Sequence, residues 1–184
     1  MDNHFVPNLT FGPPVIKSLK ASLSKQDLAY FLDAHLMVTD PKAIIPKLEN
    51  IVDSVTFHCE AVNDIGSVID MCKKHNIKAS LAIKPNTALS PELIHFCKRL
   101  DSVLIMTVEP GFGGQSMIAS CLSKVKTLRK EYPDLDIQVD GGINKDTILS
   151  ALEAGANNFV VGSGLFKHPQ GVLAAFEELH ALIH

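Results

Sequence analysis

The 184-residue sequence is poor in aromatic side chains and carries no excess of basic charge. It contains no Trp, two Tyr and nine Phe, and its 17 Lys and Arg against 20 Asp and Glu give a formal net charge of −3. Nucleic-acid binding needs a basic surface that neutralises phosphates, and single strands also need aromatic rings on which bases stack. The composition therefore argues against a nucleic-acid partner.

Long apolar runs and paired cysteine motifs are missing as well. No apolar run approaches the roughly 18–20 residues of a membrane span, and the segment 1–7 lacks the basic flank and apolar stretch of a signal peptide. The four cysteines have no CxxC spacing, which is typical of reduced thiols: Cys59, Cys72, Cys97 and Cys121. We therefore expect a cytoplasmic protein without a membrane partner.

What the sequence does contain is a regular alternation of short apolar runs and helix-like segments. Hydrophobic residues make up 46% of the chain and charged residues 20%, which excludes a disordered protein. Strands are expected at 31–38, 53–60, 78–84, 102–108, 135–140 and 157–162, and helices at 41–51, 62–75, 90–100, 120–132, 145–154 and 169–183. This order predicts one α/β domain of parallel strands joined by helices.

The pattern within the strands bears on the choice between an open sheet and a βα barrel. Strands of an open parallel sheet are buried on both faces and read as continuous apolar runs, whereas these strands alternate. The side chains expected on one shared face are Asp33, His35 and Met37; Thr56, His58 and Glu60; Ser80 and Lys84; and Gln138 and Asp140. They could be solvated edge residues of an open sheet, but a barrel lumen accounts for them better. A closed barrel of this type, however, needs eight strands and about 250 residues.

Three glycine-rich turns follow the last three predicted strands, at 110–115, 140–142 and 162–164. Glycine lets backbone N–H groups approach an anion closely, and the late loops of βα barrels often bind phosphate in this way. Each cluster could equally be a plain turn. The sequence has no complete GxGxxG or P-loop motif, so it does not support nucleotide binding of those kinds.

A carboxylate and an imidazole are expected in the same lumen, on Asp140 and His35. The two groups could share a divalent metal or act as acid and base. They could also be a hydrogen-bonded core histidine and a loop-capping aspartate. His58 and Glu60 carry the same alternatives.

These residues and the motifs around them resemble one known family. The matching segments are Met1-Asp2-Asn3-His4-Phe5-Val6-Pro7-Asn8, Asp33-Ala34-His35-Leu36-Met37-Val38, Val108-Glu109-Pro110-Gly111-Phe112-Gly113-Gly114-Gln115, Val139-Asp140-Gly141-Gly142 and Val161-Gly162-Ser163. Their order and spacing resemble ribulose-phosphate 3-epimerase from the first residue to the last. The resemblance implies a single ribulose-phosphate-binding barrel domain over residues 1–184.

The resemblance also implies an activity and a set of site residues. The family interconverts D-ribulose 5-phosphate and D-xylulose 5-phosphate in the pentose phosphate pathway and uses a divalent metal, Zn or Fe, with Mn or Co as further candidates. Asp140 is the implied acid/base, and His35 and Asp140 are the implied metal ligands and substrate contacts. The other implied residues are Gly111, Phe112, Gly113 and Gly114 closing over the substrate, Gly141 and Gly142 approaching it, Gly162 and Ser163 at its phosphate, and Met1, Met37 and Met106 lining the site. A homodimer or larger assembly is implied as well.

The sequence departs from the family pattern at its beginning. Met1 matches an internal methionine near the end of the second strand, just after a His-x-Asp run that supplies two further ligands and the second acid/base. We therefore expect a TIM (βα)8-type barrel lacking the first strand, the first helix and most of the second strand, as if read from an internal methionine. The alternatives are a catalytically impaired form that acts as a binding or regulatory fragment, and a related ketose-phosphate 3-epimerase.

Overall fold

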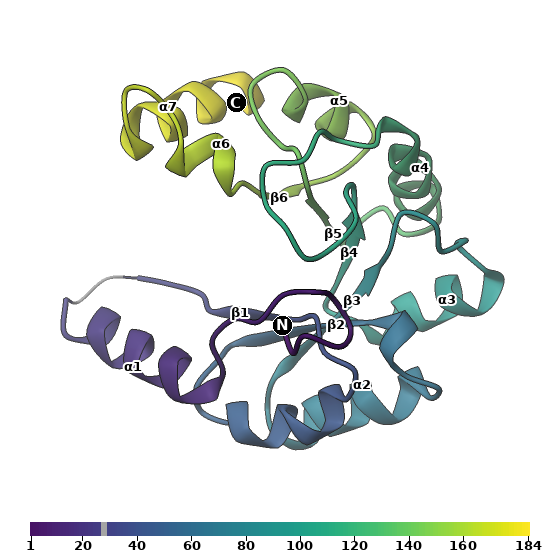
Figure 1. The fold of residues 1–184 in the computed structure, drawn as a ribbon. Helices are drawn as coiled ribbons and strands as arrows, with labels where there is room; N and C mark the ends of the chain where they lie inside the picture. Colours follow the sequence, from purple (N-terminus) through teal and green to yellow (C-terminus); the bar gives the residue numbers. More distant parts are fainter. Residues whose placement is uncertain (27–28) are drawn as a thin grey trace.

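The computed structural model describes residues 1–26 and 29–184 and shows six parallel strands that alternate with helices (Figure 1). The strands are β1 (Asp33–Leu36), β2 (Ser54–His58), β3 (Lys78–Ile83), β4 (Ser102–Met106), β5 (Asp136–Asp140) and β6 (Asn158–Val160). Each strand pairs with the next one along the chain, so the order across the sheet is the order in the sequence. All six strands lie where the sequence predicts them.

Helix α1 (Pro13–Ser24) precedes β1, and the other α-helices lie between later strands or after β6. These are α2 (Ile65–Lys74), α3 (Pro91–Phe96), α4 (Leu122–Glu131), α5 (Ile148–Glu153), α6 (Ser163–Phe166) and α7 (Val172–Ile183). Two of them begin at side-chain caps, because Asp64 accepts the backbone N–H of Ser67 and Ser90 accepts that of Leu93. Short 3₁₀ helices occur at Pro41–Ala43, Ile45–Leu48, Cys59–Ala61, Cys97–Arg99 and Ala119–Cys121.

The helix expected over 41–51 is the clearest error of the sequence prediction. The structure has two 3₁₀ helices there instead. Pro46 explains the difference, since it has no N–H to donate to an earlier carbonyl and its ring disfavours a continuous α-helix through that point. Helix α1, which buries none of its residues, precedes the part of the sequence where we expected regular structure.

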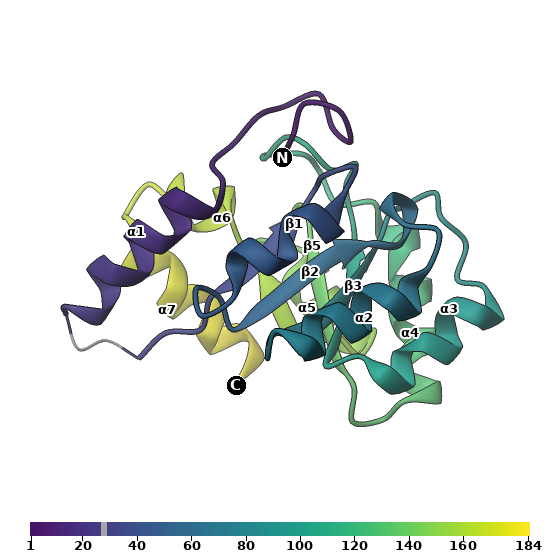
Figure 2. The ribbon, with the colours of Figure 1, turned by 90° about the horizontal axis from the view of Figure 1, so that it is seen from below.

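The sheet curls so that its two faces have different surroundings (Figures 1 and 2). Alternate residues such as Leu36, Phe57 and Leu81 are buried on the outer face, where they pack with helix residues such as Ile69. The inner face has its own apolar cluster, which consists of Val6, Met37, Ala82, Leu104, Met106 and Val108 with Met1 and Phe5 packed against it. We call this set the lumen cluster. The separation of the two faces confirms the lumen that the alternating pattern predicts.

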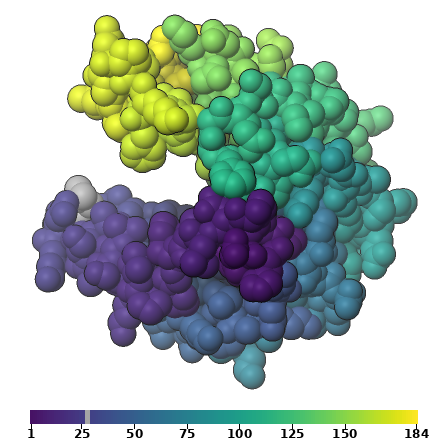
Figure 3. Space-filling view, in the orientation of Figure 1, coloured from purple at the N-terminus to yellow at the C-terminus, as the bar shows by residue number. Residues whose placement is uncertain are grey.

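The curl leaves the barrel open on one side. In the described part of the chain, β1 and β6 each pair with one neighbouring strand, and a gap separates the α1 side from the α6 and α7 side (Figures 1 and 3). An apolar groove of about 680 Å³ runs along β1, with α1 and the segment after Met1 as its other walls. Six curled parallel strands with intervening helices form an incomplete TIM barrel, as the sequence predicts.

The first residues of the chain lie across the carboxyl ends of the strands (Figure 2). Asp2 holds them there, because its carboxylate accepts the backbone N–H groups of His4 and Phe5 and both the backbone N–H and the hydroxyl of Thr39. Burial would raise the pKa of Asp2, but these hydrogen bonds outweigh it and hold the pKa well below its usual range. Asp2 thereby links the N-terminal segment to the loop after β1.

The cysteines are free thiols, as the sequence predicts. Cys72, Cys97 and Cys121 are buried, and burial raises the pKa of Cys72 and Cys97 to about 11. Within residues 1–26 and 29–184, the helices are too short or too polar to cross a membrane.

Candidate active site

A histidine and an aspartate meet across the lumen at the carboxyl ends of β1 and β5. His35 Nδ1 lies 3.6 Å from Asp140 Oδ2, and the two side chains are 19% and 23% exposed. The residues are far apart in the sequence, and the curl of the sheet brings their strands to face each other. The structure therefore brings together the two groups that the sequence proposes as metal ligands.

A chain of hydrogen bonds extends from His35 away from Asp140. His35 Nε2 lies 2.8 Å from His58 Nε2, and His58 Nδ1 lies 3.2 Å from Glu60 Oε2. The other Glu60 oxygen accepts the backbone N–H of Lys84 at 2.8 Å. These contacts join the ends of β1, β2 and β3 in one polar network.

The network favours a neutral imidazole next to an ionised carboxylate. Burial lowers the pKa of His58 and outweighs the opposing hydrogen bond to Glu60. Burial alone would raise the pKa of Glu60, but hydrogen bonds from His58, Thr87 and the Lys84 backbone outweigh it and lower the pKa to about 2. Glu60 is thus a carboxylate at neutral pH.

The glycine-rich turns after β4, β5 and β6 line one cavity next to Asp140. The predicted substrate contacts among its lining residues are Phe112, Gly113, Gly114, Asp140, Gly141, Gly142, Gly162 and Ser163. We call this lining the glycine cradle. Gly111 lies outside the lining, and its carbonyl accepts a hydrogen bond from Asn8 Nδ2 at 2.7 Å. Gly111 thus ties the loop after β4 to the N-terminal segment.

The cradle glycines differ in whether the surrounding structure leaves room for a side chain. Gly141 has φ 126°, and a Cβ there would lie 2.5 Å from a methyl group of Val108; Gly142 has φ 67°, and its Cβ would lie 2.4 Å from the backbone nitrogen of Met117. The fold itself requires glycine at these two positions. A Cβ at Gly113 or Gly162 would meet no atom of the described residues within 4 Å. The space beside these two backbone positions is open, so packing does not require glycine there.

The predicted methionines lie together below this polar end. Met37 is 8% exposed and Met106 is 1% exposed, both within the lumen cluster, and the partly buried Met1 packs against it. Thioether side chains fill irregular apolar space and offer water only weak hydrogen bonds. The floor of the site is therefore apolar.

A metal ion fits part of this arrangement. Two ligands bonded to one tetrahedral metal at about 2.1 Å lie roughly 3.4 Å apart, close to the 3.6 Å between His35 Nδ1 and Asp140 Oδ2. Over residues 1–26 and 29–184, however, no three His, Cys, Asp or Glu side chains converge as a metal-binding group. The pair can supply two ligands, and the described residues do not complete the set.

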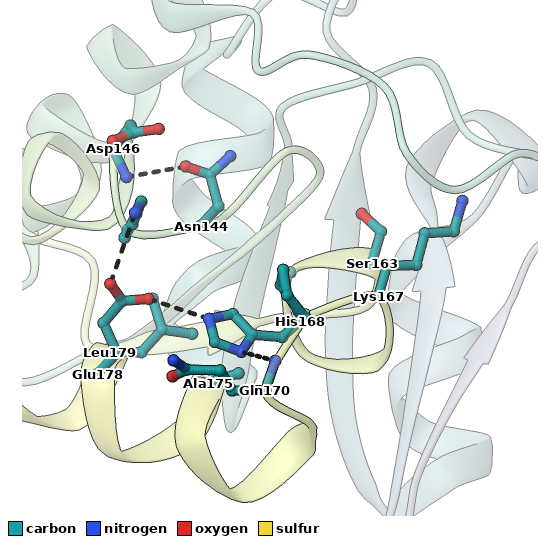
Figure 4. Close-up of a pocket in the computed structure, with 12 residues that line it drawn as sticks. Asn144, Asp146, Ser163, Lys167, His168, Gln170, Ala175, Glu178 and Leu179 are labelled. Carbon is teal, nitrogen blue, oxygen red and sulfur yellow. Dashed lines mark hydrogen bonds and ion pairs between the residues drawn. The ribbon is translucent and has the colours of Figure 1, made fainter.

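A second pocket, of about 500 Å³, lies beside the cradle between the loop after β5 and helices α6 and α7 (Figure 4). Its polar groups mainly pair with one another: Glu178 contacts Lys145 and His168 at 3.6 Å each. Ser163 and Lys167 lie apart from this group in the figure. Lys167 Nζ lies 4.0 Å from the position that a Cβ on Gly114 would take, so this cation is close to the cradle.

The sequence interpretation did not select three of the residues that the structure places at this end of the lumen. Lys167 gave no usable signal, because a lysine three residues after a glycine turn is unremarkable on a surface. His58 and Glu60 did give one, since alternation places both on the inner face, but their type and position left their role open. The network with His35 shows what they contact.

Comparison with known proteins identifies the family. The model of the "Ribulose-phosphate 3 epimerase family" matches residues 1–166. A ribulose-phosphate 3-epimerase from Eremothecium gossypii is 44% identical over 174 residues, which cover 90% of this chain and 72% of the relative. The cytoplasmic isoform of the enzyme from Oryza sativa subsp. japonica is 42% identical over 184 residues, which cover 97% of this chain and 78% of the relative.

Solved structures agree on the fold. A 3-hexulose-6-phosphate synthase matches with a TM-score of 0.65 at 20% identity, covering 98% of this chain and 88% of its own. A tryptophan synthase α-subunit from Pyrococcus furiosus matches with a TM-score of 0.61 at 14% identity, covering 93% and 71%. At these identities the likeness concerns architecture alone. Because the family model and relatives at about 40% identity cover most of the sequence, the chain belongs to the ribulose-phosphate 3-epimerase family.

Proposed function

We propose that this protein interconverts D-ribulose 5-phosphate and D-xylulose 5-phosphate by inverting the configuration at C3. The observation that carries the proposal is the contact between His35 and Asp140 beside the glycine cradle, in a chain that belongs to this family. Asp140 and the cradle offer a proton acceptor and backbone N–H groups beside one cavity, and His35 brings an imidazole next to Asp140. These are the functional groups needed to deprotonate a carbon next to a ketone on a phosphorylated sugar.

Asp140 is the proposed acid/base. Its carboxylate is partly exposed at the end of β5 and lines the cradle, so it can reach a bound substrate from one side. Epimerisation also needs a second group that returns the proton on the opposite face. The family pattern uses two aspartates for this purpose, and Asp140 matches one of them.

We propose His35 and Asp140 as two ligands of a divalent metal, on the strength of their 3.6 Å separation. When bound, such an ion stabilises the negative charge of an enediolate as a Lewis acid. His35 would present one ring nitrogen to it, and Asp140 would both bind it and exchange the proton. The described residues supply no third ligand, so water, substrate or further protein groups would complete the coordination.

The other candidate site residues have proposed roles that their positions support. The open backbone at Gly113 and Gly162, with Ser163, would hold the phosphate, and the loop at Gly111 and Phe112 would cover the sugar. Met1, Met37 and Met106 would keep water from the apolar side of the enediolate. We further propose one functional domain over residues 1–184, a cytoplasmic location like that of the rice relative, and a homodimer or larger assembly.

The direct test is turnover by the purified chain. D-Ribulose 5-phosphate is incubated with the protein and Zn²⁺, Fe²⁺, Mn²⁺ or Co²⁺ in turn, and D-xylulose 5-phosphate is measured. We expect conversion with at least one of these ions and its loss in excess EDTA, because the proposed metal supplies the positive charge that stabilises an enediolate.

The same assay separates the alternatives. Absence of conversion with every ion would contradict the proposed activity and favour the catalytically impaired fragment. Faster conversion of a six-carbon ketose phosphate than of the pentulose phosphate would favour a related epimerase. Sedimentation of the same sample tests the proposed assembly, which a monomer would contradict.

A further inference from the structure

The feature that the proposed reaction does not use is the hydrogen-bonded chain behind His35. It begins at the backbone N–H of Lys84, passes through the Glu60 carboxylate and the His58 imidazole, and ends at His35 Nε2, with successive separations of 2.8, 3.2 and 2.8 Å. The opposite nitrogen of His35, Nδ1, faces Asp140. We propose that Glu60 and His58 are positioning residues that hold His35 in the tautomer with its proton on Nε2 and its lone pair on Nδ1, facing Asp140.

The direction of the chain follows from what each group can donate. A neutral imidazole has one N–H donor and one acceptor nitrogen, whereas a carboxylate only accepts. Glu60 is such an acceptor on both oxygens, because the Lys84 backbone N–H occupies one and the His58 ring faces the other. His58 must then carry its proton on Nδ1 and accept at Nε2. His35 must donate from Nε2, which leaves its Nδ1 without a proton.

The surroundings of His58 prevent other arrangements. Its side chain is fully buried, so a water molecule has no room to replace either partner. The Phe5 ring packs on it with centroids 4.8 Å apart, and the Lys84 ammonium lies 3.8 Å from the centroid of that Phe5 ring. The His35 and His58 rings are nearly coplanar and meet at their edges, with centroids 5.0 Å apart and an interplanar angle of 22°. Phe5 packing and burial thus hold the ring of His58 in place, and its two hydrogen bonds determine its tautomer.

The tautomer matters because of what His35 Nδ1 faces. With a proton on Nδ1, His35 would donate to Asp140, and the carboxylate proposed as the acid/base would be occupied by its neighbour. With a lone pair there, Nδ1 is free to bind a cation or to accept a hydrogen bond, and Asp140 stays available. Some side chains orient a metal-binding histidine through its other ring nitrogen. Replacing such a side chain commonly lowers activity or metal affinity by about 10–100-fold.

The substitution Glu60→Gln tests the direction of the chain. The Lys84 backbone N–H is a fixed donor, so the new side chain must turn its carbonyl oxygen toward it. Its NH₂ group then faces His58 Nδ1 and donates where the carboxylate accepted. Both imidazoles must reverse, and His35 must carry its proton on Nδ1. The substitution preserves shape and packing while it inverts the hydrogen bonding.

The measurement is the protonation of each ring nitrogen, read from ¹⁵N NMR of histidine-labelled protein in EDTA at neutral pH. We expect Nε2–H on His35 and Nδ1–H on His58 in the wild type, and the reverse on both in Glu60→Gln. Glu49→Gln is the matched control, because Glu49 pairs with His75 Nδ1 at 3.3 Å on the outside of the molecule. It should leave His35 unchanged. A proton on His35 Nδ1 in the wild type, or no reversal in Glu60→Gln, overturns the proposal.

A second variant keeps the proposal testable if Glu60→Gln does not fold. In His58→Gln, the side-chain carbonyl can accept from His35 and the NH₂ group can donate to Glu60, so the direction of the chain is kept. We expect His35 to retain Nε2–H there, and a switch to Nδ1–H would overturn the proposal even if Glu60→Gln failed to fold.

The consequence for turnover rests on the proposed function, whereas the NMR measurement does not. We expect kcat of Glu60→Gln to fall about 10–100-fold with KM nearly unchanged, and Glu49→Gln to match the wild type. If the wild-type chain has no epimerase activity, the proposed function fails while the tautomers still test the chain. If the wild type is active and Glu60→Gln reverses the tautomers without loss of kcat, the positioning role is overturned.

Discussion

The two ends of the lumen contain similar polar residues in different arrangements. At the amino end, the Thr56 hydroxyl donates to the Asp33 carboxylate at 2.9–3.0 Å, and this closed pair leads to no cavity of the candidate site. At the carboxyl end, a chain of three polar side chains leads from Glu60 to His35, whose free nitrogen faces Asp140 and the cradle. In TIM barrels, conserved chemistry lies at the carboxyl ends of strands and the amino ends serve stability. The difference indicates that only one end is arranged to act on a ligand.

The largest expected difference between the two ends concerns their aspartates. Asp140→Asn keeps the size of the side chain but removes its basicity, so kcat should fall about 10²–10⁴-fold. Asp33→Asn, at the amino end, should leave kcat within about twofold of the wild type, because Asp33 lies outside the cradle lining. Steady-state kinetics on both variants makes the comparison, with thermal unfolding as the check on folding. Equal losses of kcat in the two variants would contradict the inference that only the carboxyl end acts on a ligand.

The next effect concerns the apolar layer between the two ends. Leu104 is 1% exposed in the lumen cluster, and Leu104→Ala should lower the free energy of unfolding by about 2–5 kcal/mol, because it leaves a cavity. Leu173 on α7 is 71% exposed, and Leu173→Ala should change stability by less than about 0.5 kcal/mol. Urea unfolding measures both. A large effect at Leu173 would show that an assembly buries this face.

The smallest effect is a pH dependence at the carboxyl end. The pKa of Glu60 is about 2 in the folded protein against 4.5 for the free group. A lowered pKa means that the ionised form stabilises the fold above pH 4.5, and that this stabilisation is lost as the pH falls from 4.5 toward 2. The difference in unfolding free energy between the wild type and Glu60→Gln should therefore shrink between pH 5 and pH 3. A difference that does not vary over this range would contradict the role of Glu60 as a carboxylate.

Much of this architecture can be read from the sequence because its signals are local. The alternation of His35 and Met37 with Leu36 and Val38 predicts which side chains enter the lumen, and the glycine turns predict where the strands end. The helix expected over 41–51 is wrong because Pro46, inside that segment, interrupts the hydrogen bonding of an α-helix. Local patterns thus predict strands well, and they predict helices less well where prolines recur.

By itself, the sequence determined the family, the order of the six strands and the types of residue at their ends. Only the tertiary structure decided which of those residues touch. Strand register places His35 beside Thr56, yet His35 bonds to His58 and faces Asp140. The physical reason is that strands in a curled sheet are tilted, so side chains at the same height come from different rows of the register. A pairing that depends on tilt and curvature leaves no pattern in a linear sequence.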